Sequence, residues 1–484
     1  MTGPVPHGFQ IVLDPETVVF NDGRALLGGD PLRLMRLTSA GGTVLTELLA
    51  HPVRDAREGA LARRLLDAGV AHPRSPRGPV TGPVTVVIPV RDRPAELGRL
   101  LAALCAESCD DAPAETIVVD DGSTAPDTVA AVVARYGARL VRRSACGGPA
   151  AARNTGLAAA SDAELVAFLD SDCVPPPGWL SALAAHFADP EVGAVAPRIR
   201  PRATGRSTLA AYAAARSPLD LDHRAARVRP GSRVAYVPTA TLLVRRAALD
   251  PVAFDESLRF GEDVDAVWRM IDAGWTVRYD PSVRVAHDEP ATWATYLRRR
   301  FRYGTSGGPL GRRHGDRLAP VVLRPWSSAV AGLLLAGRPG LAATVTAASA
   351  AWFTRALRET GMPTSVAARL TLRPVGGTLV GMGRALTQLG LPVAVATTVA
   401  LPGRRARRLL VLGGLVAAPA LRDWAVTRTR LDPVRWTLAS VVDDMSYGAG
   451  VWWGALRSRS LAPLLPRFVR DAGAGRRADA AAGR

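Results

Sequence analysis

The strongest constraint on the fold is an alternation of short apolar runs with helical segments between Val84 and Leu169. The apolar runs, rich in β-branched residues, are Val84–Val90, Thr116–Val119, Leu140–Val141 and Leu165–Leu169. Residues with helical spacing separate them, over 95–106, 125–136 and 149–160. This alternation predicts a parallel sheet wrapped by helices, whose ligands bind at the carboxyl ends of the strands. We therefore expect an α/β domain with its functional residues directly after the strands.

Acidic residues follow two of these predicted strands. Asp120 and Asp121 end the second, where the base N–H and ribose hydroxyls of a nucleotide would provide the donors that two adjacent carboxylates need. For Asp121 an Asx turn or a helix N-cap is the alternative. Asp170 and Asp172 follow Leu169, and Mg²⁺ is usually held by one or two such carboxylates together with substrate phosphates. A cation there would neutralise a leaving diphosphate.

A third acidic cluster, Glu262, Asp263 and Asp265, opens a predicted helix that continues through Met270. Acidic residues are favourable in a first helical turn because they complement the helix dipole. The sharper interpretation is that one of them is a general base, which takes a proton from an acceptor hydroxyl. Both interpretations predict a helix that begins at this cluster.

Six segments between residues 84 and 290 follow one another in a particular order. They read VTVVIPVRDRP, ETIVVDDGST, GGPAAARNTG, VAFLDSD, FDESLRFGEDVDAVWRMIDAGW and VRVAHDEP. Residues 84 to about 305 thereby resemble a family-two glycosyltransferase with the GT-A fold. The resemblance implies a nucleotide-sugar donor, a divalent Mg or Mn ion, and direct displacement with inversion at the sugar.

The resemblance also implies roles for individual positions. Asp120 would contact the nucleotide base or ribose, Asp170 the donor sugar or ribose, and Asp172 would be the main metal ligand. Asp263 would be the catalytic base, with Glu262 as its helper or as an acceptor contact.

Further positions are expected around the donor by the same resemblance. The nucleotide-sugar site would also include Pro89, Arg91 and Asp121, with Arg153 and Asn154 at the start of a helix beside the diphosphate. His287 matches a position that is sometimes a metal or diphosphate ligand. Its alternative is a helix cap or a surface histidine.

The chain departs from the family pattern in two places. Arg91 stands where relatives often carry Asn or Tyr, and an Arg-rich stretch, Tyr296–Gly304, replaces the Gln-x-x-Arg-Trp signature of cellulose-synthase-like enzymes. Arg299 and Arg302 in that stretch could clamp the leaving diphosphate through bidentate contacts. A solvated basic helix face is the alternative, and processive synthesis is not expected.

The N-terminal part predicts a small unit of its own. Strands are expected near residues 11–13 and 18–20, a turn at Asn21-Asp22-Gly23, and a helical apolar stripe from Leu34 to Leu49, followed by a second from Leu61 to Leu66. The segment His72–Pro83 is dense in Pro and Gly and predicts a linker.

The two flanks narrow the resemblance. Residues 34–73 resemble the small winged-helix peptide-recognition domains of the pyrroloquinoline-quinone chaperone type, and a segment near the C-terminus reads DDMSYGAGVWWGALRSRSLAPLLP. The whole chain is similar to the glycosyltransferase family of the mycofactocin system. That implies glucose transfer from UDP-glucose to a peptide-derived redox cofactor or its precursor peptide, held by the N-terminal domain, to build a short β-linked glucan. A lipid-linked or polysaccharide acceptor is the alternative.

We accordingly expect three parts, 1–80, 84–316 and 317–484. The formal charge of +18 is divided unevenly among them, because residues up to Asp316 carry 38 Arg against 36 acidic residues and the remainder 23 against 7. A basic excess of this kind attracts anionic partners such as nucleic acid or a membrane surface. Zinc-finger and RNP-type signatures are absent, so we expect no nucleic acid.

The last third is apolar and punctuated by Arg. Its longest charge-free run, Ala385–Gly403, is marginal for a transmembrane helix, which needs about 20 predominantly apolar residues. Packing on the catalytic domain is one interpretation; the other is contact with an anionic membrane, where Arg404, Arg405, Arg407 and Arg408 could meet the headgroups. The four Cys predict ordinary reduced thiols, although Cys105 and Cys109 have the spacing of half a metal site.

The first ten residues, MTGPVPHGFQ, show neither a basic nor a continuous apolar stretch, so no secretory signal is expected. We expect a cytoplasmic protein associated with the inner face of the cell membrane.

Overall fold

The computed structural model describes residues 3–76, 82–108, 111–160, 162–202, 205–249, 251, 253–357, 364–400, 403, 405–427 and 429–468. Two compact units make up the chain. Unit 1 comprises Met1–Arg206 and Arg216–Glu289, and unit 2 comprises Ser207–Ala215 and Pro290–Arg484. The division into 1–80, 84–316 and 317–484 stays a prediction, because compact units describe packing and not independent folding.

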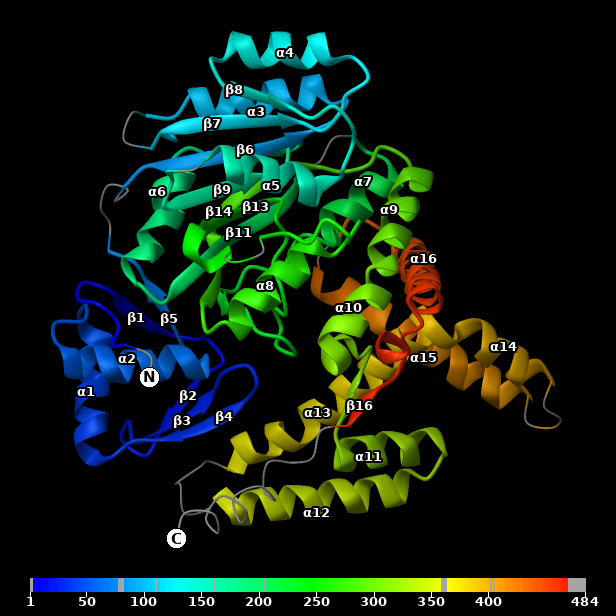
Figure 1. Cartoon of the computed structure of the whole chain (residues 1–484). Helices are drawn as coiled ribbons and strands as arrows, with labels where there is room; N and C mark the ends of the chain where they lie inside the picture. The colour runs from blue at the N-terminus through cyan, green and yellow to red at the C-terminus, as the bar shows by residue number, and fades with distance from the viewer. Residues whose placement is uncertain are drawn as a thin grey trace. The chain divides into compact units, whose positions relative to one another are not determined.

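Unit 1 begins with an N-terminal module, residues 3–76. Its elements are β1 (Gln10–Leu13), β2 (Val18–Phe20), β3 (Ala25–Gly28), β4 (Arg33–Arg36), α1 (Ser39–Ala50), α2 (Ala56–Ala68) and β5 (Ala71–Arg74). β1 pairs with β5, and β2, β3 and β4 form a second antiparallel sheet (Figure 1). Apolar side chains of α1 and α2 fill the core of the module, among them Leu45, Leu48, Leu65 and Leu66.

The structure corrects two expectations for this module. Leu34 was expected in a helical stripe, but it lies in β4 opposite Leu27, because the backbone of β3 pairs with that segment. Helix α1 begins only at Ser39, where the side chain of Thr38 caps it by accepting from the Gly41 amide at 3.1 Å. His72 and its neighbours, expected in a linker, pair with β1 as strand β5; residues 77–81 lie outside the described residues.

The rest of unit 1 is built on one mixed sheet. Its strands are β6 (Val84–Val90), β7 (Glu115–Asp120), β8 (Arg139–Arg142), β9 (Leu165–Leu169), β10 (Cys173–Val174), β11 (Val192–Arg202), β12 (Ala226–Arg227), β13 (Thr241–Arg245) and β14 (Thr276–Asp288). The order is β10-β14-β11-β13-β9-β6-β7-β8, with β12 beside β14. The four strands predicted from the sequence, β6 to β9, are mutually parallel neighbours.

The four predicted strands are parallel as expected, whereas the rest of the sheet is mixed. β13 runs antiparallel to β9 and to β11, and β10 and β12 run antiparallel to β14. Beyond β9 the connections no longer follow the strand–helix–strand alternation on which the expectation depended, so the direction of each strand is set by pairing rather than by a helical crossover.

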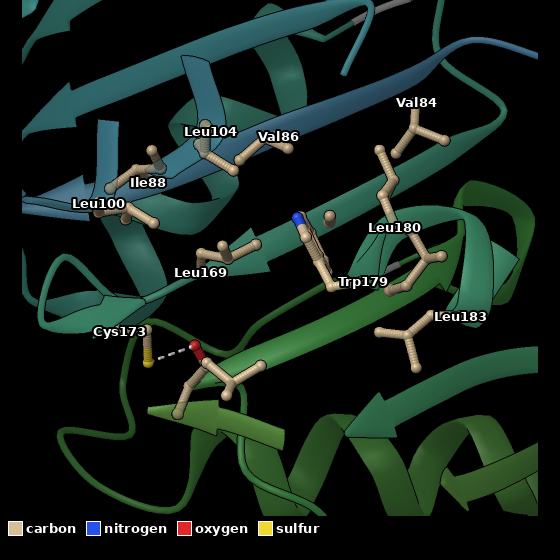
Figure 2. Packing of buried hydrophobic residues seen from close by; sticks show 14 of the residues in the cluster. Val84, Val86, Ile88, Leu100, Leu104, Leu169, Cys173, Trp179, Leu180 and Leu183 are labelled. Carbon is tan, nitrogen blue, oxygen red and sulfur yellow. Dashed lines mark hydrogen bonds between the residues drawn. The ribbon is translucent and has the colours of Figure 1, made fainter. Parts of the chain in front are cut away.

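Helices of unit 1 include α3 (Pro94–Cys105), α4 (Pro126–Arg135), α5 (Pro149–Ala159), α6 (Trp179–Ala184) and α8 (Glu262–Asp272). Three of them, α3, α4 and α5, have Pro in the first turn, where its fixed φ suits the helix and its missing N–H costs nothing. Figure 2 shows the core that joins α3 and α6 to the sheet, with Trp179 among Val84, Leu169 and Leu180. Cys173 donates from its thiol to the Ala240 carbonyl at 3.1 Å in the same core.

Unit 2 is mainly helical. Its helices are α7 (Thr208–Ala215), α9 (Trp293–Thr305), α10 (Gly307–His314), α11 (Pro325–Leu335), α12 (Pro339–Leu357), α13 (Thr364–Ala385), α14 (Leu391–Ala400), α15 (Arg405–Thr427) and α16 (Pro433–Ser458). An aromatic cluster of Tyr212, Trp293, Tyr296 and Trp436 holds α7, α9 and α16 together. Within it, the buried carboxylate of Asp443 accepts from the Tyr212 hydroxyl at 2.9 Å.

Two stretches of unit 2, Leu372–Ala400 and Arg405–Thr427, are long and apolar enough to cross a membrane. Only 11% of the most apolar 18 residues of each stretch are buried. They include most of the run Ala385–Gly403 noted in the sequence. Arg405, at the start of α15, is exposed, whereas Arg404 lies outside the described residues.

Candidate active site

The carboxyl end of β7 carries the first two candidate residues. Asp120 is 1% exposed, and one of its oxygens, Oδ1, accepts from the Ser123 amide at 2.9 Å. Its other oxygen, Oδ2, is buried and has no hydrogen-bond donor among the described residues. A buried acceptor without a donor costs free energy, so this oxygen suits a ligand that brings an N–H or O–H group.

Asp121 differs from Asp120 in that its carboxylate oxygens already accept hydrogen bonds from the segment before α5. It accepts from the amides of Gly147 and Gly148 at 2.9 and 2.8 Å, and from Arg143 Nε at 2.9 Å. Burial by itself raises the pKa of Asp121, but these donors outweigh it, and the pKa is lowered from its usual 3.8. The side chain therefore orders the loop, and this is closer to the turn-forming alternative than to direct contact with a nucleotide.

The loop after β6 lies beside Asp120. Pro89 pairs with Val119 and Val90 with Asp120 across the parallel strands, so the two strand ends are adjacent. Arg91, the departure from the family pattern, donates from Nη1 to the thiol of Cys146 at 2.8 Å. The predicted donor-site residues Pro89, Arg91 and Asp120 thus share one end of the sheet.

Arg153 connects two acidic elements of the site. From α5, its Nη2 donates to Asp170 at 2.7 Å and its Nη1 to Glu262 at 2.8 Å. The side chain is 4% exposed, and burial would lower its pKa, but the two carboxylates outweigh this and raise the pKa. The guanidinium therefore stays charged and fixes the end of β9 to the start of α8.

Asp263 is the half-buried neighbour of this network. Burial and the charge of Glu262 raise its pKa to about 7, although Arg153 acts in the other direction. Its Oδ1 accepts from the Val264 amide at 2.8 Å. A carboxylate with a pKa near neutrality is suited to accept a proton during a reaction and to release it afterwards.

Asp172 and His287 come together although 115 positions separate them. His287 Nε2 lies 3.6 Å from Asp172 Oδ1, because β10 and β14 are paired neighbours. The second oxygen, Oδ2, contacts the guanidinium of Arg93. On the other side of the imidazole, Glu289 lies 3.8 Å from Nδ1.

These residues fit a divalent cation that substrate completes. A carboxylate oxygen and an imidazole nitrogen are suitable ligands, and Asp172 is only 13% exposed and carries the guanidinium of Arg93 as its countercharge. Within the described parts of the chain, no three His, Cys, Asp or Glu side chains form a metal site by themselves. Mg²⁺ and similar ions commonly take several ligands from substrate phosphates and water.

The roles predicted for three further residues stay predictions. Asn154 holds the 254–256 segment, since its amide bonds to the backbone of Phe254 in both directions, at 2.8 and 3.1 Å, and to Glu256 at 3.0 Å. Arg299 and Arg302 belong to α9 in unit 2, so their contact with a diphosphate stays a prediction.

Sequence reasoning missed the parts played by Arg93, Arg143 and Glu289. Arg93 and Glu289 lie in the motifs VRDRP and HDEP, whose spacing could have drawn attention to them. Arg143 had no local signal, because its contact with Asp121 depends on how the loop folds back.

A family model described as "Glycosyl transferase family 2" matches residues 85–250, which include β6 to β9 and the acidic residues at their ends. This part of unit 1 is a family-two glycosyltransferase domain with a GT-A-type mixed sheet, as the sequence predicted. Over 479 residues, 96% of this chain and 98% of the relative, the chain is 38% identical to a protein of Mycobacterium tuberculosis named "Pre-mycofactocin glycosyltransferase". The chain belongs to the pre-mycofactocin glycosyltransferase family.

Other matches cover less of the chain. An "N-acetylglucosaminyltransferase" of Rhizobium meliloti is 30% identical over 261 residues, 47% of this chain and 59% of that protein. Among solved structures, a mannosyltransferase from Pyrobaculum calidifontis, in complex with GDP-Man and Mn²⁺, gives a TM-score of 0.42 at 18% identity, covering 76% of this chain and 89% of that one.

Proposed function

We propose that the protein transfers glucose from UDP-glucose to a peptide-derived redox cofactor of the mycofactocin type, with inversion, and builds a short β-linked glucan. The observation that supports this reaction class most is the raised pKa of Asp263, about 7, which suits a general base. Asp263 directly follows Glu262, which Arg153 connects to Asp170. The name of the Mycobacterium tuberculosis relative supports the acceptor.

In the proposed reaction, Asp263 takes the proton of the acceptor hydroxyl as that oxygen attacks the anomeric carbon and the diphosphate departs from the opposite face. Asp120 offers its buried oxygen to the nucleoside, and Asp170, 34% exposed, faces the donor from the end of β9. Holding the two reactants in line supplies most of such a rate enhancement. A divalent cation held by Asp172, with His287 beside it, would supply Lewis-acid stabilisation of the leaving diphosphate.

Asp263→Asn tests the assignment of the base. The amide keeps the shape of the side chain but cannot accept the proton, so we expect transfer to fall by at least about a thousandfold, within the range of general-base contributions. Mass increments of one hexose measure transfer, and calorimetry with UDP measures the donor site, which should be unchanged. Asp272→Asn, an exposed residue at the other end of α8, is the matched control. Parental transfer by Asp263→Asn would refute the role.

The acceptor assignment is tested separately. We propose that the N-terminal module binds the precursor peptide or the cofactor derived from it. Titration of a fluorescently labelled synthetic precursor peptide with the full chain should raise the fluorescence anisotropy of the peptide to a plateau, which indicates saturable binding. Equal transfer to lipid-linked or polysaccharide acceptors, with no peptide binding, would favour the alternative acceptor instead.

We further propose that unit 2 contacts an anionic membrane surface. On α16, Val434, Leu438, Met445 and Leu456 are between 41% and 69% exposed, and their spacing puts them along one side of the helix. The exposed Arg405 supplies charge for anionic headgroups. Sedimentation with vesicles of phosphatidylglycerol should carry the protein down, and phosphatidylcholine vesicles should do so less; recovery in the supernatant with both would contradict the proposal.

A further inference from the structure

A segment of unit 1, residues 224–237, lies between the N-terminal module and helix α8; we call it the strap. Three contacts join it to the module: Arg224 with Glu16 at 2.9 Å, Arg227 with Asp67, and the backbone amide of Arg233 with the carboxylate of Asp30. Glu16 lies between β1 and β2, Asp67 in α2 and Asp30 between β3 and β4, so the strap contacts three parts of the module.

The other end of the strap is fixed to α8. The carbonyl of Ala235 accepts from Trp268 Nε1 at 2.8 Å, and Trp268 is only 2% exposed. Val234 and Val237 of the strap are buried as well, at 1% and 0% exposure. Trp268 follows Asp263 by five positions, about 8 Å along the helix axis. A displacement of the strap would therefore displace the helix that carries the proposed base in its first turn.

The sheet holds the strap at residues 226–228. Its β12 part pairs with β14, with Arg227 opposite Arg278, and the Val228 amide donates to the Val277 carbonyl at 2.8 Å. The side chain of Arg278 contacts Asp189 at 3.3 Å, the same carboxylate that Arg63 of the module holds at 2.6 and 3.0 Å.

These contacts make the module a fixed support. Arg63 and Asp189 are 4% and 1% exposed, and breaking a buried pair of this kind is strongly unfavourable because it leaves an uncompensated charge. The module is thus anchored at Asp189, while its contacts with the strap, more exposed, are the ones that binding on the module could alter.

We propose that the N-terminal module positions the Glu262–Asp263 pair through the strap, so that the module takes part in arranging the catalytic site as well as in binding. The proposal rests on the proposed function in taking Asp263 as the base and the module as the binding site of the acceptor. Arg227, Arg233 and Trp268 are positioning residues, because they act on the pair through α8. Binding of an acceptor to the module would therefore alter the position of Asp263 through the strap and α8.

Hydrogen exchange of the full chain tests the proposal without depending on activity. Asp67→Arg places two guanidinium groups against each other at the contact between module and strap, and the amides of residues 265–270 should then exchange about tenfold faster. The charge-swapped variant, Asp67→Arg with Arg227→Asp, should restore parental exchange. Glu115→Arg is the matched control, since Glu115 pairs with Arg139 at 3.2 Å. That pair joins β7 and β8, which lie at the other end of the strand order from β14, the strand that α8 contacts. The control should leave residues 265–270 unchanged.

Unchanged exchange at 265–270 in Asp67→Arg, with faster exchange in the strap, would overturn the proposal. Equal acceleration in Glu115→Arg would overturn it too, since the effect would then be general destabilisation. If Asp67→Arg fails to fold, Asp30→Ala removes the acceptor of the Arg233 amide and is judged by the same criteria. Where transfer is measurable, kcat should fall in Asp67→Arg and return in the swapped variant, with KM for UDP-glucose constant; absence of transfer in every variant would count against the proposed function alone.

Discussion

Arg153 donates to Glu262 at 2.8 Å across 109 positions of sequence. Its other Nη nitrogen holds Asp170, so one guanidinium spans the end of β9 and the start of α8. The two carboxylates belong to the halves of the site that we assign to donor and acceptor. Their common partner fixes the distance between those halves, and this relationship shapes the electrostatics of Asp263.

Glu262→Gln should move the pH dependence of transfer to lower pH. The charge of Glu262 helps to raise the pKa of Asp263 to about 7, and a neutral amide removes that contribution. Because the base must be deprotonated, activity rises with pH through this pKa. The acidic limb of the pH profile of kcat should therefore shift to lower pH by about one pH unit. Initial rates between pH 5 and 9 measure the shift, and a limb that stays in place or moves upward would contradict this origin of the pKa.

Asp263→Asn should stabilise the protein while it abolishes transfer. The folded pKa of about 7 lies above the usual 3.8, so between these values the native state binds more protons than the unfolded state. The free energy of unfolding therefore falls as pH rises through this window, and Asn escapes the penalty. We expect a gain of about 1 to 2 kcal/mol at pH 8, after allowance for solvent screening, and almost none at pH 4. Urea unfolding at both pH values is the measurement; an equal effect at the two would exclude the linkage.

Arg93→Met should strengthen binding of Mn²⁺ in the absence of donor. The guanidinium contacts Asp172, the proposed metal ligand, and its removal leaves that carboxylate without a competing cation. Since the Arg93 side chain is 52% exposed, we expect a modest effect, about three- to fivefold in Kd. Electron paramagnetic resonance of bound Mn²⁺ measures it. Arg139→Met, at the partly exposed pair with Glu115, is the control and should change nothing.

Gly450→Ala should destabilise unit 2. A Cβ at this position of α16 would lie 2.0 Å from the Phe301 carbonyl oxygen of α9, so the helix backbones would have to separate. We expect a loss of about 2 to 3 kcal/mol, the upper range for overpacking. Gly413→Ala in α15 is the matched control: its Cβ would meet nothing within 4 Å, and the helix should gain up to about 1 kcal/mol. Thermal unfolding of both variants decides; similar losses would mean that the close helix contact is not the cause.

Much of the site could be predicted from the sequence because its acidic residues follow strands. The pattern of β6 to β9 puts Asp120, Asp170 and Asp172 at one end of parallel neighbours, and the structure has these strands adjacent. Helix α8 begins at Glu262, as the acidic cluster predicted. Local periodicity sufficed here, since each side chain is placed by the element that carries it.

Other contacts had no local signal. The guanidinium of Arg153 reaches Glu262 only because α5 and α8 meet beside the sheet, and Asn154, one residue on, is turned to the 254–256 segment instead. The hydrogen bonds that the segment 143–148 donates to Asp121 likewise depend on how the chain folds back. Such pairings are decided by packing between distant elements, which leaves no period in the sequence.

The sequence by itself determined the class of the domain and its acidic strand ends, because strand and helix periodicity and the chemistry of carboxylates are local properties. Only the tertiary structure decided which carboxylates share the guanidinium of Arg153, which one has its pKa raised, and that the strap joins the module to α8. Those properties depend on burial and on distances between residues far apart in the chain, and both exist only once the sheet has assembled.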